Sequence, residues 1–303
     1  MEKEFVGWLK SRLHPAPAPV QLGVGDDAGV IDVAGPMVVT TDTIADGTHF
    51  DSSVHSLEQI GHKAISVNLS DIAAMGAAPT AATINFLCPY EFGLDDAKAL
   101  FMGIEKTANR FDTCIFGGDT NCWDGKLVVS ATLFGTANSN TEFWKMSGSK
   151  PGDVILVSGE LGGSILNKHI EFVPRVELAS YLAGKFSIHS ATDITDSLAI
   201  DLAAMAKQSE LGFQLNANSI PISEDARTLS EKSGRPALEH AIYDGEDFEL
   251  LLSTTPETAD LICGDDQLPV AVHRIGKFTD APDFLIVGED SEIGELEIRG
   301  YEH

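Results

Sequence analysis

Apolar residues fall into two patterns along the chain, short strand-like runs and longer stretches with helical spacing. In the first half, the strand-like runs are rich in β-branched or aromatic residues, and they cover residues 37–43, 81–87, 113–116 and 127–136. Apolar spacing of three to four residues predicts helices over residues 5–13, 57–75 and 95–110. The first helix ends at H-P-A-P-A-P, because proline cannot continue a helix.

A polar segment rich in glycine, serine and proline, N-S-N-T-E-F-W-K-M-S-G-S-K-P-G-D at residues 138–153, divides this pattern in two. Beyond it, strands are predicted over residues 154–158, 248–253, 270–278 and 284–287. Helices are predicted over residues 175–184, 193–209 and 223–232. We therefore predict an α/β or α+β protein with two domains of similar size, residues 1–138 and 139–303.

The chain of 303 residues has 46 acidic and 20 basic residues, a formal charge of −26. This balance argues against nucleic-acid binding, because no basic surface can neutralise phosphates. No run approaches 18 apolar residues, and the N-terminus lacks the apolar centre of a signal peptide, so we expect a cytoplasmic protein without a membrane span. The four cysteines show no C-x-x-C spacing, which indicates neither a zinc site nor a disulfide framework.

Acidic residues recur where one predicted element gives way to the next. The segments are G-V-G-D-D-A-G (23–29), T-T-D-T-I-A-D-G-T-H-F-D (40–51), N-L-S-D-I-A-A-M-G (68–76), F-G-G-D-T-N (116–121) and T-D-I-T-D-S-L (192–198). We expect Asp42 and Asp119 at the ends of apolar strands, where ligand sites of α/β proteins open. Asp71 and Asn68 form one polar spot on an otherwise apolar helix, and a buried carboxylate there requires a cation.

Each acidic segment also has an ordinary structural interpretation. Asp193 and Asp196 could cap the helix that follows them, and Gly25-Asp26-Asp27 could form a simple turn. Asp71 could pair with one of the 20 basic residues. Taken together, carboxylates without basic partners predict a site for hard divalent cations, most simply Mg²⁺, which in turn favours a phosphate-bearing ligand. The phosphate loop G-x-x-x-x-G-K-[ST] is absent, and G-V-G-D-D-A lacks the third glycine of a dinucleotide-binding motif.

Several of these motifs, in this order, resemble those of the thiamine-monophosphate kinase family. They are G-V-G-D-D-A, T-T-D-T-x-x-x-G-x-H-F, K-A-I-S-V-N-L-S-D-I-A-A-M-G-A-A-P, G-G-D-T, S-G-S-K-P-G-D and D-G-E-D-F-E-L-L. The wider superfamily includes aminoimidazole ribonucleotide synthetase, selenophosphate synthetase and a hydrogenase-maturation protein. The resemblance implies a two-domain architecture with mixed sheets and flanking helices, a homodimer, and ATP-dependent phosphorylation of thiamine monophosphate to thiamine diphosphate.

The resemblance also implies roles for individual residues. Several Mg²⁺ ions would be held by Asp27, Thr40, Thr41, Asp42, Asp71, Asp119, Asp193 and Asp196. ATP would be contacted by Gly118, Asp119, Lys145 and Thr195. Thiamine monophosphate would be contacted by His49, Glu246 and Tyr301. No general base is expected, because the accepting phosphate oxygen is already ionised at pH 7 and the metals offset the repulsion between two anions.

The chain departs from the family pattern at four places. Met146 stands where the family has arginine, beside Lys145, and D-I-T-D-S-L replaces D-x-S-D-G-L. Asp244 replaces the first glycine of G-G-E-D, and the chain ends in G-Y-E-H in place of an aromatic-rich tail. Two other functions stay open at this point: another ATP-using enzyme of the superfamily, such as an aminoimidazole ribonucleotide synthetase, and a nucleotide or metal sensor without turnover.

Overall fold

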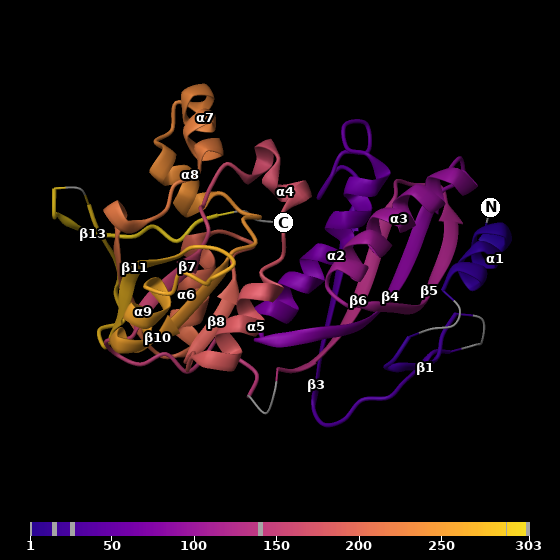
Figure 1. Cartoon of the computed structure of the whole chain (residues 1–303). Coiled ribbons are helices and arrows are strands. Elements are labelled where there is room, and N and C mark those ends of the chain that lie inside the picture. Colours follow the sequence, from indigo (N-terminus) through magenta and orange to yellow (C-terminus); the bar gives the residue numbers. More distant parts are fainter. Residues whose placement is uncertain (1, 14–16, 25–27, 139–141, 289, 301–303) are drawn as a thin grey trace. The chain divides into compact units, whose positions relative to one another are not determined.

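The computed structural model describes residues 2–13, 17–24, 28–138, 142–288 and 290–300 (Figure 1). Its backbone contacts divide the chain into two compact units. Unit 1 comprises residues 1–72 and 77–137, and unit 2 comprises residues 73–76 and 138–303. Each unit combines a β-sheet with helices, so the predicted α/β fold class is confirmed.

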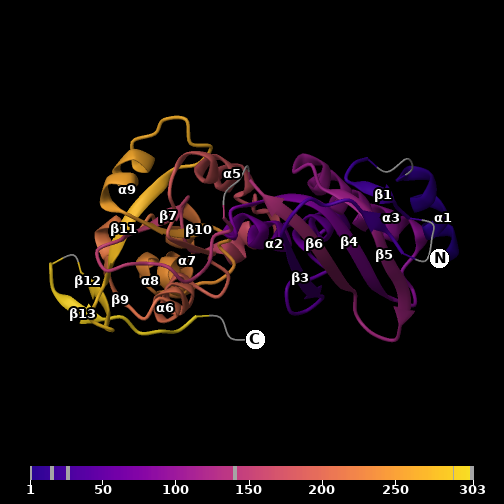
Figure 2. The ribbon, with the colours of Figure 1, turned by 90° about the horizontal axis from the view of Figure 1, so that it is seen from below.

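Unit 1 is built on a four-stranded sheet in the order β3-β6-β4-β5, seen from below in Figure 2. Its strands are β1 (Val20–Leu22), β2 (Val30–Ile31), β3 (Met37–Ala45), β4 (Ala77–Pro89), β5 (Cys114–Trp123) and β6 (Val128–Ala137). Its helices are α1 (Glu2–Arg12), α2 (Leu57–Ala74) and α3 (Leu94–Arg110). Strands β4 and β5 are parallel, with α3 as the connection, and the other sheet pairs are antiparallel. Strands β1 and β2 form a separate two-stranded sheet.

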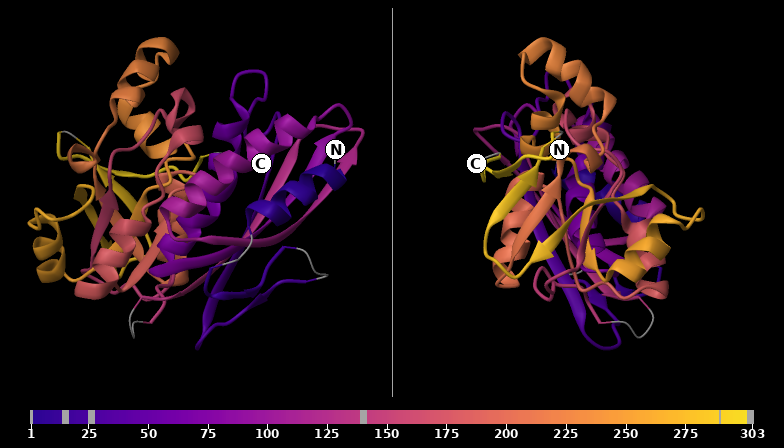
Figure 3. Two further views of the ribbon diagram at one scale, coloured as in Figure 1. Left: turned by 45° about the vertical axis from the view of Figure 1, so that its right-hand side comes forward. Right: turned by 90° about the vertical axis from the view of Figure 1, so that its left-hand side faces the viewer.

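Helices α2 and α3 cover one face of this sheet, and α1 lies beside them (Figure 3). Alternate residues of β6, Val129, Ala131 and Leu133, are buried on that face because successive side chains of a strand point to opposite sides. The two long helices touch backbone to backbone at Gly103, where a Cβ atom would lie 2.1 Å from the carbonyl oxygen of Glu58.

Unit 2 is built on a seven-stranded sheet in the order β13-β12-β9-β11-β7-β10-β8. Its strands are β7 (Val154–Ser158), β8 (Ser190–Asp193), β9 (Gly212–Asn216), β10 (Leu250–Thr254), β11 (Val272–Thr279), β12 (Phe284–Val287) and β13 (Ile293–Glu295). Its helices are η1 (Ser164–Leu166), α4 (Lys168–Glu171), α5 (Val176–Lys185), α6 (Leu198–Gln208), η2 (Ala217–Ser219), α7 (Glu224–Ser233), α8 (Ala237–Tyr243) and α9 (Pro256–Cys263). Only the β9–β12 pair is parallel among these neighbours.

The core of unit 2 forms around α6, whose apolar residues Leu198, Leu202 and Met205 are fully buried. The helix predicted over residues 193–209 begins only at Leu198, because Asp193 belongs to the edge strand β8 and residues 194–197 form a loop that ends in the N-cap Ser197. The sequence S-A-T-D of this strand has no run of apolar residues that would predict it. Its pairing with β10 decides its structure, which is a tertiary effect.

Within the described part of the chain, every helix is too short or too polar to cross a bilayer.

The close contact between α2 and α3 predicts that a larger residue at Gly103 lowers the stability of the protein. Replacing Gly103 by alanine places a methyl group against the backbone at Glu58, and we expect a loss of about 1–3 kcal/mol of folding free energy. Gly7 in α1 is the matched control, since no atom lies within 4 Å of its ideal Cβ position, and Gly7→Ala gains about 0.5–1 kcal/mol. Thermal unfolding of both variants checks this, and equal midpoints would contradict the close helix contact.

Candidate functional site

Asp42 lies inside strand β3, which continues to Ala45, and not at the end of a strand as the sequence predicted. That prediction is wrong because β3 is an edge strand and only partly buried, so polar residues do not have to end it. The first half of the charged stretch after Val39 is therefore strand, and the turn begins only beyond Ala45.

The alternation of β3 turns Thr40 and Asp42 toward the helix-covered face and Thr41 toward the other face. The Thr40 hydroxyl donates a hydrogen bond to Asp71 of helix α2 at 2.5 Å, and the carboxyl groups of Asp42 and Asp71 are hydrogen-bonded to each other. Thr41 Oγ1 instead donates to the carbonyl of Ala131 at 3.1 Å. Of the three consecutive residues predicted as ligands, two therefore meet Asp71 and one does not.

The carboxyl groups of Asp42 and Asp71 interact directly in unit 1. A hydrogen bond between two carboxyl groups requires a proton on one of them. Burial raises the pKa of Asp42, while the hydrogen bond to Asp71 and the nearby His49 lower it, and the net shift is upward. A bound cation would replace that proton and allow both groups to ionise.

The donor set fits Mg²⁺, which is usually held by one or two carboxylates and completes its shell with water and phosphate oxygens. One helical turn before Asp71, the fully buried Asn68 has a side-chain oxygen without a hydrogen-bond partner. In the described residues, no group of three or more histidine, cysteine or acidic side chains is arranged so that it could hold a metal ion, so any ion here would rely on additional oxygen ligands. Asp27, also predicted as a ligand, lies outside the described residues.

His49 is fixed close to this carboxyl pair. Its Nδ1 accepts a hydrogen bond from the backbone N–H of Ala45 at 3.1 Å, so the neutral ring carries its proton on Nε2. Its carbonyl accepts a hydrogen bond at 2.7 Å from Lys63, a fully buried lysine of α2. Lys63 is not among the residues predicted from the sequence, although a lysine in the apolar helix K-A-I-S-V-N-L-S-D is a signal of the same kind as Asp71.

Gly118 and Asp119 lie inside β5, and the prediction of a strand end is wrong here too. Gly118 has φ +150°, and a Cβ atom there would lie 1.8 Å from the carbonyl oxygen of Ile84, so only glycine fits. Asp119 accepts hydrogen bonds from the N–H of Thr120 at 2.9 Å and the side chain of Asn121 at 2.6 Å. These contacts orient its carboxylate on the exposed side of the strand.

The two acidic positions of the unit 1 sheet lie at opposite edges of it. Residue pairing runs in one row from Asp42 through Ala131 and Ile84 to Gly118, across all four strands. Three strand spacings amount to about 14 Å. Because Mg²⁺–oxygen distances are about 2 Å, Asp42 and Asp119 of one chain cannot bind the same ion.

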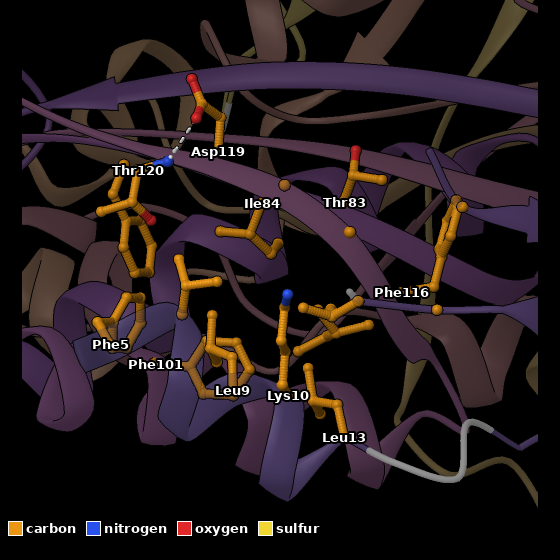
Figure 4. Close-up of a pocket in the computed structure, with 18 of the residues that line it drawn as sticks. Phe5, Leu9, Lys10, Leu13, Thr83, Ile84, Phe101, Phe116, Asp119 and Thr120 are labelled. Carbon is orange, nitrogen blue, oxygen red and sulfur yellow. Dashed lines mark hydrogen bonds between the residues drawn. The ribbon is translucent and has the colours of Figure 1, made fainter. Parts of the chain in front are cut away.

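A cavity of about 500 Å³ adjoins Gly118 and Asp119 (Figure 4). Its apolar wall comes from α1, α3 and the sheet, with Phe5, Phe101 and Phe116 among the lining residues. The side chain of Lys10 points into it (Figure 4). An apolar cavity with a few polar groups at its rim is typical of a small-molecule site.

In unit 2, Asp193 ends strand β8, and Thr195 and Asp196 form the loop before α6. Neither aspartate caps that helix: Ser197 does, accepting a hydrogen bond from the N–H of Ile200 at 3.1 Å. The capping interpretation is therefore wrong for both. Ser197 replaces the family's glycine without strain, because its φ of 162° is extended backbone.

Glu246 is held next to this loop by backbone pairing. Its N–H donates to the carbonyl of Thr195 at 2.7 Å, and the N–H of Phe248 donates to the carbonyl of Ile194 at 2.8 Å. Glu246 and Phe248 both adopt positive φ, 58° and 50°. Such backbone persists only where surrounding contacts fix it.

The side chains of Asp247 and Asp244 supply contacts that fix this backbone. Asp247, fully buried, accepts hydrogen bonds from the N–H of Gly162, and burial raises its pKa to about 7. Asp244, one of the departures from the family pattern, accepts from the N–H of Gly163 at 3.2 Å and contacts His240 Nδ1 at 2.8 Å. In the glycine-rich turn G-E-L-G-G-S, the N–H groups of Gly162 and Gly163 thus hold the Glu246 loop and are not free for a phosphate.

Lys145 and Met146 lie in unit 2, in the segment that follows the last strand of unit 1. Lys145 is exposed on a groove of unit 2 lined also by Trp144 and His189, and its carbonyl accepts from the N–H of Ala191 at 2.8 Å. Met146, which replaces the family's arginine, contacts the side chain of Gln208 through its sulfur. Tyr301 lies outside the described residues.

Two matches to protein families cover most of the chain. The family described as AIR synthase related protein, N-terminal domain, matches residues 25–137, and its C-terminal counterpart matches residues 150–288. Fold and site together thus define a two-domain protein of the AIR synthase related class.

Relatives within that class narrow the assignment. The chain is 41% identical to the thiamine-monophosphate kinase of Rhodopirellula baltica, over 91% of this chain and 89% of the relative. It is 28% identical to that of Bacillus subtilis, with 94% of both chains covered. A solved thiamine-monophosphate kinase from Stenotrophomonas maltophilia superposes with a TM-score of 0.81 at 29% identity, covering 93% of this chain and 95% of that one. The chain belongs to the thiamine-monophosphate kinase family.

Replacing Asp42 should have opposite effects on the stability of the protein without and with bound Mg²⁺. Asp42→Asn can donate to Asp71 without an extra proton, so at pH 8 without Mg²⁺ we expect the protein to gain about 0.5–2 kcal/mol of stability. The same change should remove most of the stabilisation by Mg²⁺ and a nucleotide analogue. Thermal unfolding with and without these ligands measures both effects.

Asp95→Asn serves as the control, because Asp95 is exposed on α3 and the substitution makes the same charge change. It should leave the response to Mg²⁺ unchanged. A wild-type response in Asp42→Asn would mean that the pair is not a cation site.

Proposed function

We propose that this protein is an ATP-dependent thiamine-monophosphate kinase that transfers the γ-phosphoryl group of ATP directly to the phosphate of thiamine monophosphate. The observation that carries the proposal is the hydrogen-bonded pair Asp42–Asp71 in a chain 41% identical to a thiamine-monophosphate kinase. This pair supports the use of divalent cations, which a reaction between two anionic substrates needs.

Unit 1 supplies the greater part of the proposed ATP and Mg²⁺ contacts. Thr40, Asp42 and Asp71 would hold one Mg²⁺ ion, with Asp27 and Thr41 as further candidates from the resemblance. Asp119 would hold a second ion, because it lies about 14 Å from Asp42 across the sheet. Gly118 would contact the nucleotide, whose base has room in the adjoining cavity of about 500 Å³.

Unit 2 supplies the remaining proposed contacts. Asp193 and Asp196 are candidates for a further Mg²⁺ ion, and Thr195 and Lys145 for the nucleotide. Glu246 and Tyr301 are candidates for the acceptor, with Glu246 on a loop joined to Thr195 by a backbone hydrogen bond of 2.7 Å.

The proposed reaction needs no general base, because an oxygen of the acceptor phosphate is already ionised at neutral pH. Bound Mg²⁺ ions would neutralise the phosphates and the charge that develops during transfer. The task of the protein is to orient the substrates and exclude water. His49 would donate a hydrogen bond from Nε2 to an oxygen of the acceptor phosphate, since Ala45 occupies its Nδ1.

We also propose that the protein acts as a homodimer, as the family resemblance implies. Support comes from the sheet of unit 1, whose face away from α2 and α3 exposes Val39, Thr41 and Thr43 on the edge strand β3. An edge strand with an exposed apolar residue is a natural contact for a second copy. Light scattering after gel filtration should give twice the mass of the chain, and a monomer at working concentration would contradict the proposal.

The function is tested by incubating the protein with ATP, Mg²⁺ and thiamine monophosphate and separating the products by chromatography. We expect thiamine diphosphate and ADP in equal amounts, and no product from unphosphorylated thiamine, which lacks the ionised acceptor oxygen. Asp42→Asn should be inactive and Asp95→Asn fully active. ADP formed without thiamine diphosphate would indicate another reaction of the superfamily, and nucleotide binding without turnover would indicate a sensor.

A further inference from the structure

Asp201, in the first turn of α6, holds the loop that carries Thr195 and Asp196. Its Oδ2 accepts hydrogen bonds from three consecutive backbone N–H groups, those of Thr195 at 2.9 Å, Asp196 at 3.1 Å and Ser197 at 3.2 Å. The residue is 7% exposed. The backbone of residues 195–197 therefore curves around one carboxylate oxygen.

The start of helix α6 does not by itself explain why a buried carboxylate is present at Asp201. Ser197 already caps α6, so Asp201 is not needed for that role. The carboxylates of Asp193 and Asp196 lie close enough to act on Asp201 electrostatically. A buried carboxylate beside two others is unfavourable, and the three N–H groups offset only part of that cost, because the pKa of Asp201 is still raised to about 7.

The loop anchored by Asp201 is also hydrogen-bonded to Glu246, which is a proposed contact of the acceptor. The peptide N–H of Thr195 points to Asp201, and the carbonyl of Thr195 accepts the N–H of Glu246 at 2.7 Å. On its other side the loop is covered by the C-terminal segment: the Ser197 hydroxyl donates to the carbonyl of Arg299 at 3.1 Å, and a Cβ atom at Gly300 would lie 2.4 Å from that hydroxyl.

We propose that Asp201 is a positioning residue that fixes the Asp193–Ser197 loop in its ligand-binding geometry before any cation or nucleotide arrives. Asp201 itself does not bind the ligands, because its Oδ2 is committed to the three N–H groups. The assignment of this loop to Mg²⁺ and nucleotide rests on the proposed function, whereas the anchoring itself does not.

Hydrogen exchange in the ligand-free protein tests the anchoring. In Asp201→Ala, the amides of residues 195–197 should exchange at least about tenfold faster, because their N–H groups lose a charged acceptor. Asp201→Asn keeps an acceptor oxygen and should show a smaller increase. If the alanine variant does not fold, the asparagine variant alone decides.

Enzyme kinetics test whether the anchoring by Asp201 affects the Mg²⁺ dependence of the reaction. In Asp201→Ala the Mg²⁺ concentration for half-maximal formation of thiamine diphosphate should rise about tenfold, with kcat at saturating Mg²⁺ within about threefold of wild type. The control is Thr255→Ala, which removes the N-cap hydroxyl of α9 in the same unit and should leave loop exchange and the Mg²⁺ dependence unchanged.

The outcomes separate the two proposals. If wild-type protein forms no thiamine diphosphate, the proposed function fails, while the exchange experiment still decides on Asp201. Wild-type exchange of residues 195–197 in both Asp201 variants would overturn the positioning role. So would an unchanged Mg²⁺ dependence in an active Asp201→Ala enzyme, since a purely structural role would lower stability without moving it.

Discussion

A carboxylate removed from water must be compensated, and this chain has 46 acidic residues and only 20 basic ones. The structure answers this constraint in two ways. In unit 2, buried carboxylates such as Asp201 and Asp247 accept backbone N–H groups, and Glu249 is paired with Lys168 and Arg175. In unit 1, Asp42 and Asp71 hydrogen-bond each other. The first arrangement uses donors of the protein itself, whereas in the second a bound cation would replace the shared proton and allow both carboxyl groups to ionise.

The geometry of a strand then decides which candidate ligands can act together. Because side chains alternate along β3, Thr40 and Asp42 face α2 while Thr41 does not. Because Asp42 and Asp119 lie on opposite edges of a four-stranded sheet, they cannot share an ion within one chain. A reaction that brings two phosphate-bearing substrates together can use separate ions in this way, one for each cluster of charge.

Two departures from the family pattern have a physical function in unit 2. Ser197 adds a helix cap and a hydrogen bond to the segment before the C-terminus. Asp244 adds a carboxylate that joins Gly163 and His240 to the loop of Glu246. Both replace glycine at positions where the backbone does not require it, φ 162° at Ser197 and φ −75° at Asp244. They strengthen the loops around Thr195 and Glu246 and remove none of the proposed ligands.

The sequence alone determined the fold class, the family and most of the long elements, because apolar periodicity and long motifs are local properties of the chain. Helix α2 and strand β12 were predicted to within a residue, and the unusual position of Asp71 on an apolar helix was visible from its neighbours. The tertiary structure decided what depends on pairing partners: that Asp42 and Asp119 lie inside strands, that residues 190–193 form a strand, and that Ser197 caps α6. It also revealed Asp201 and Lys63, whose roles come from hydrogen bonds to the backbone of other segments. Such contacts leave no periodic trace in the sequence, because the partners are brought together only when the chain has folded.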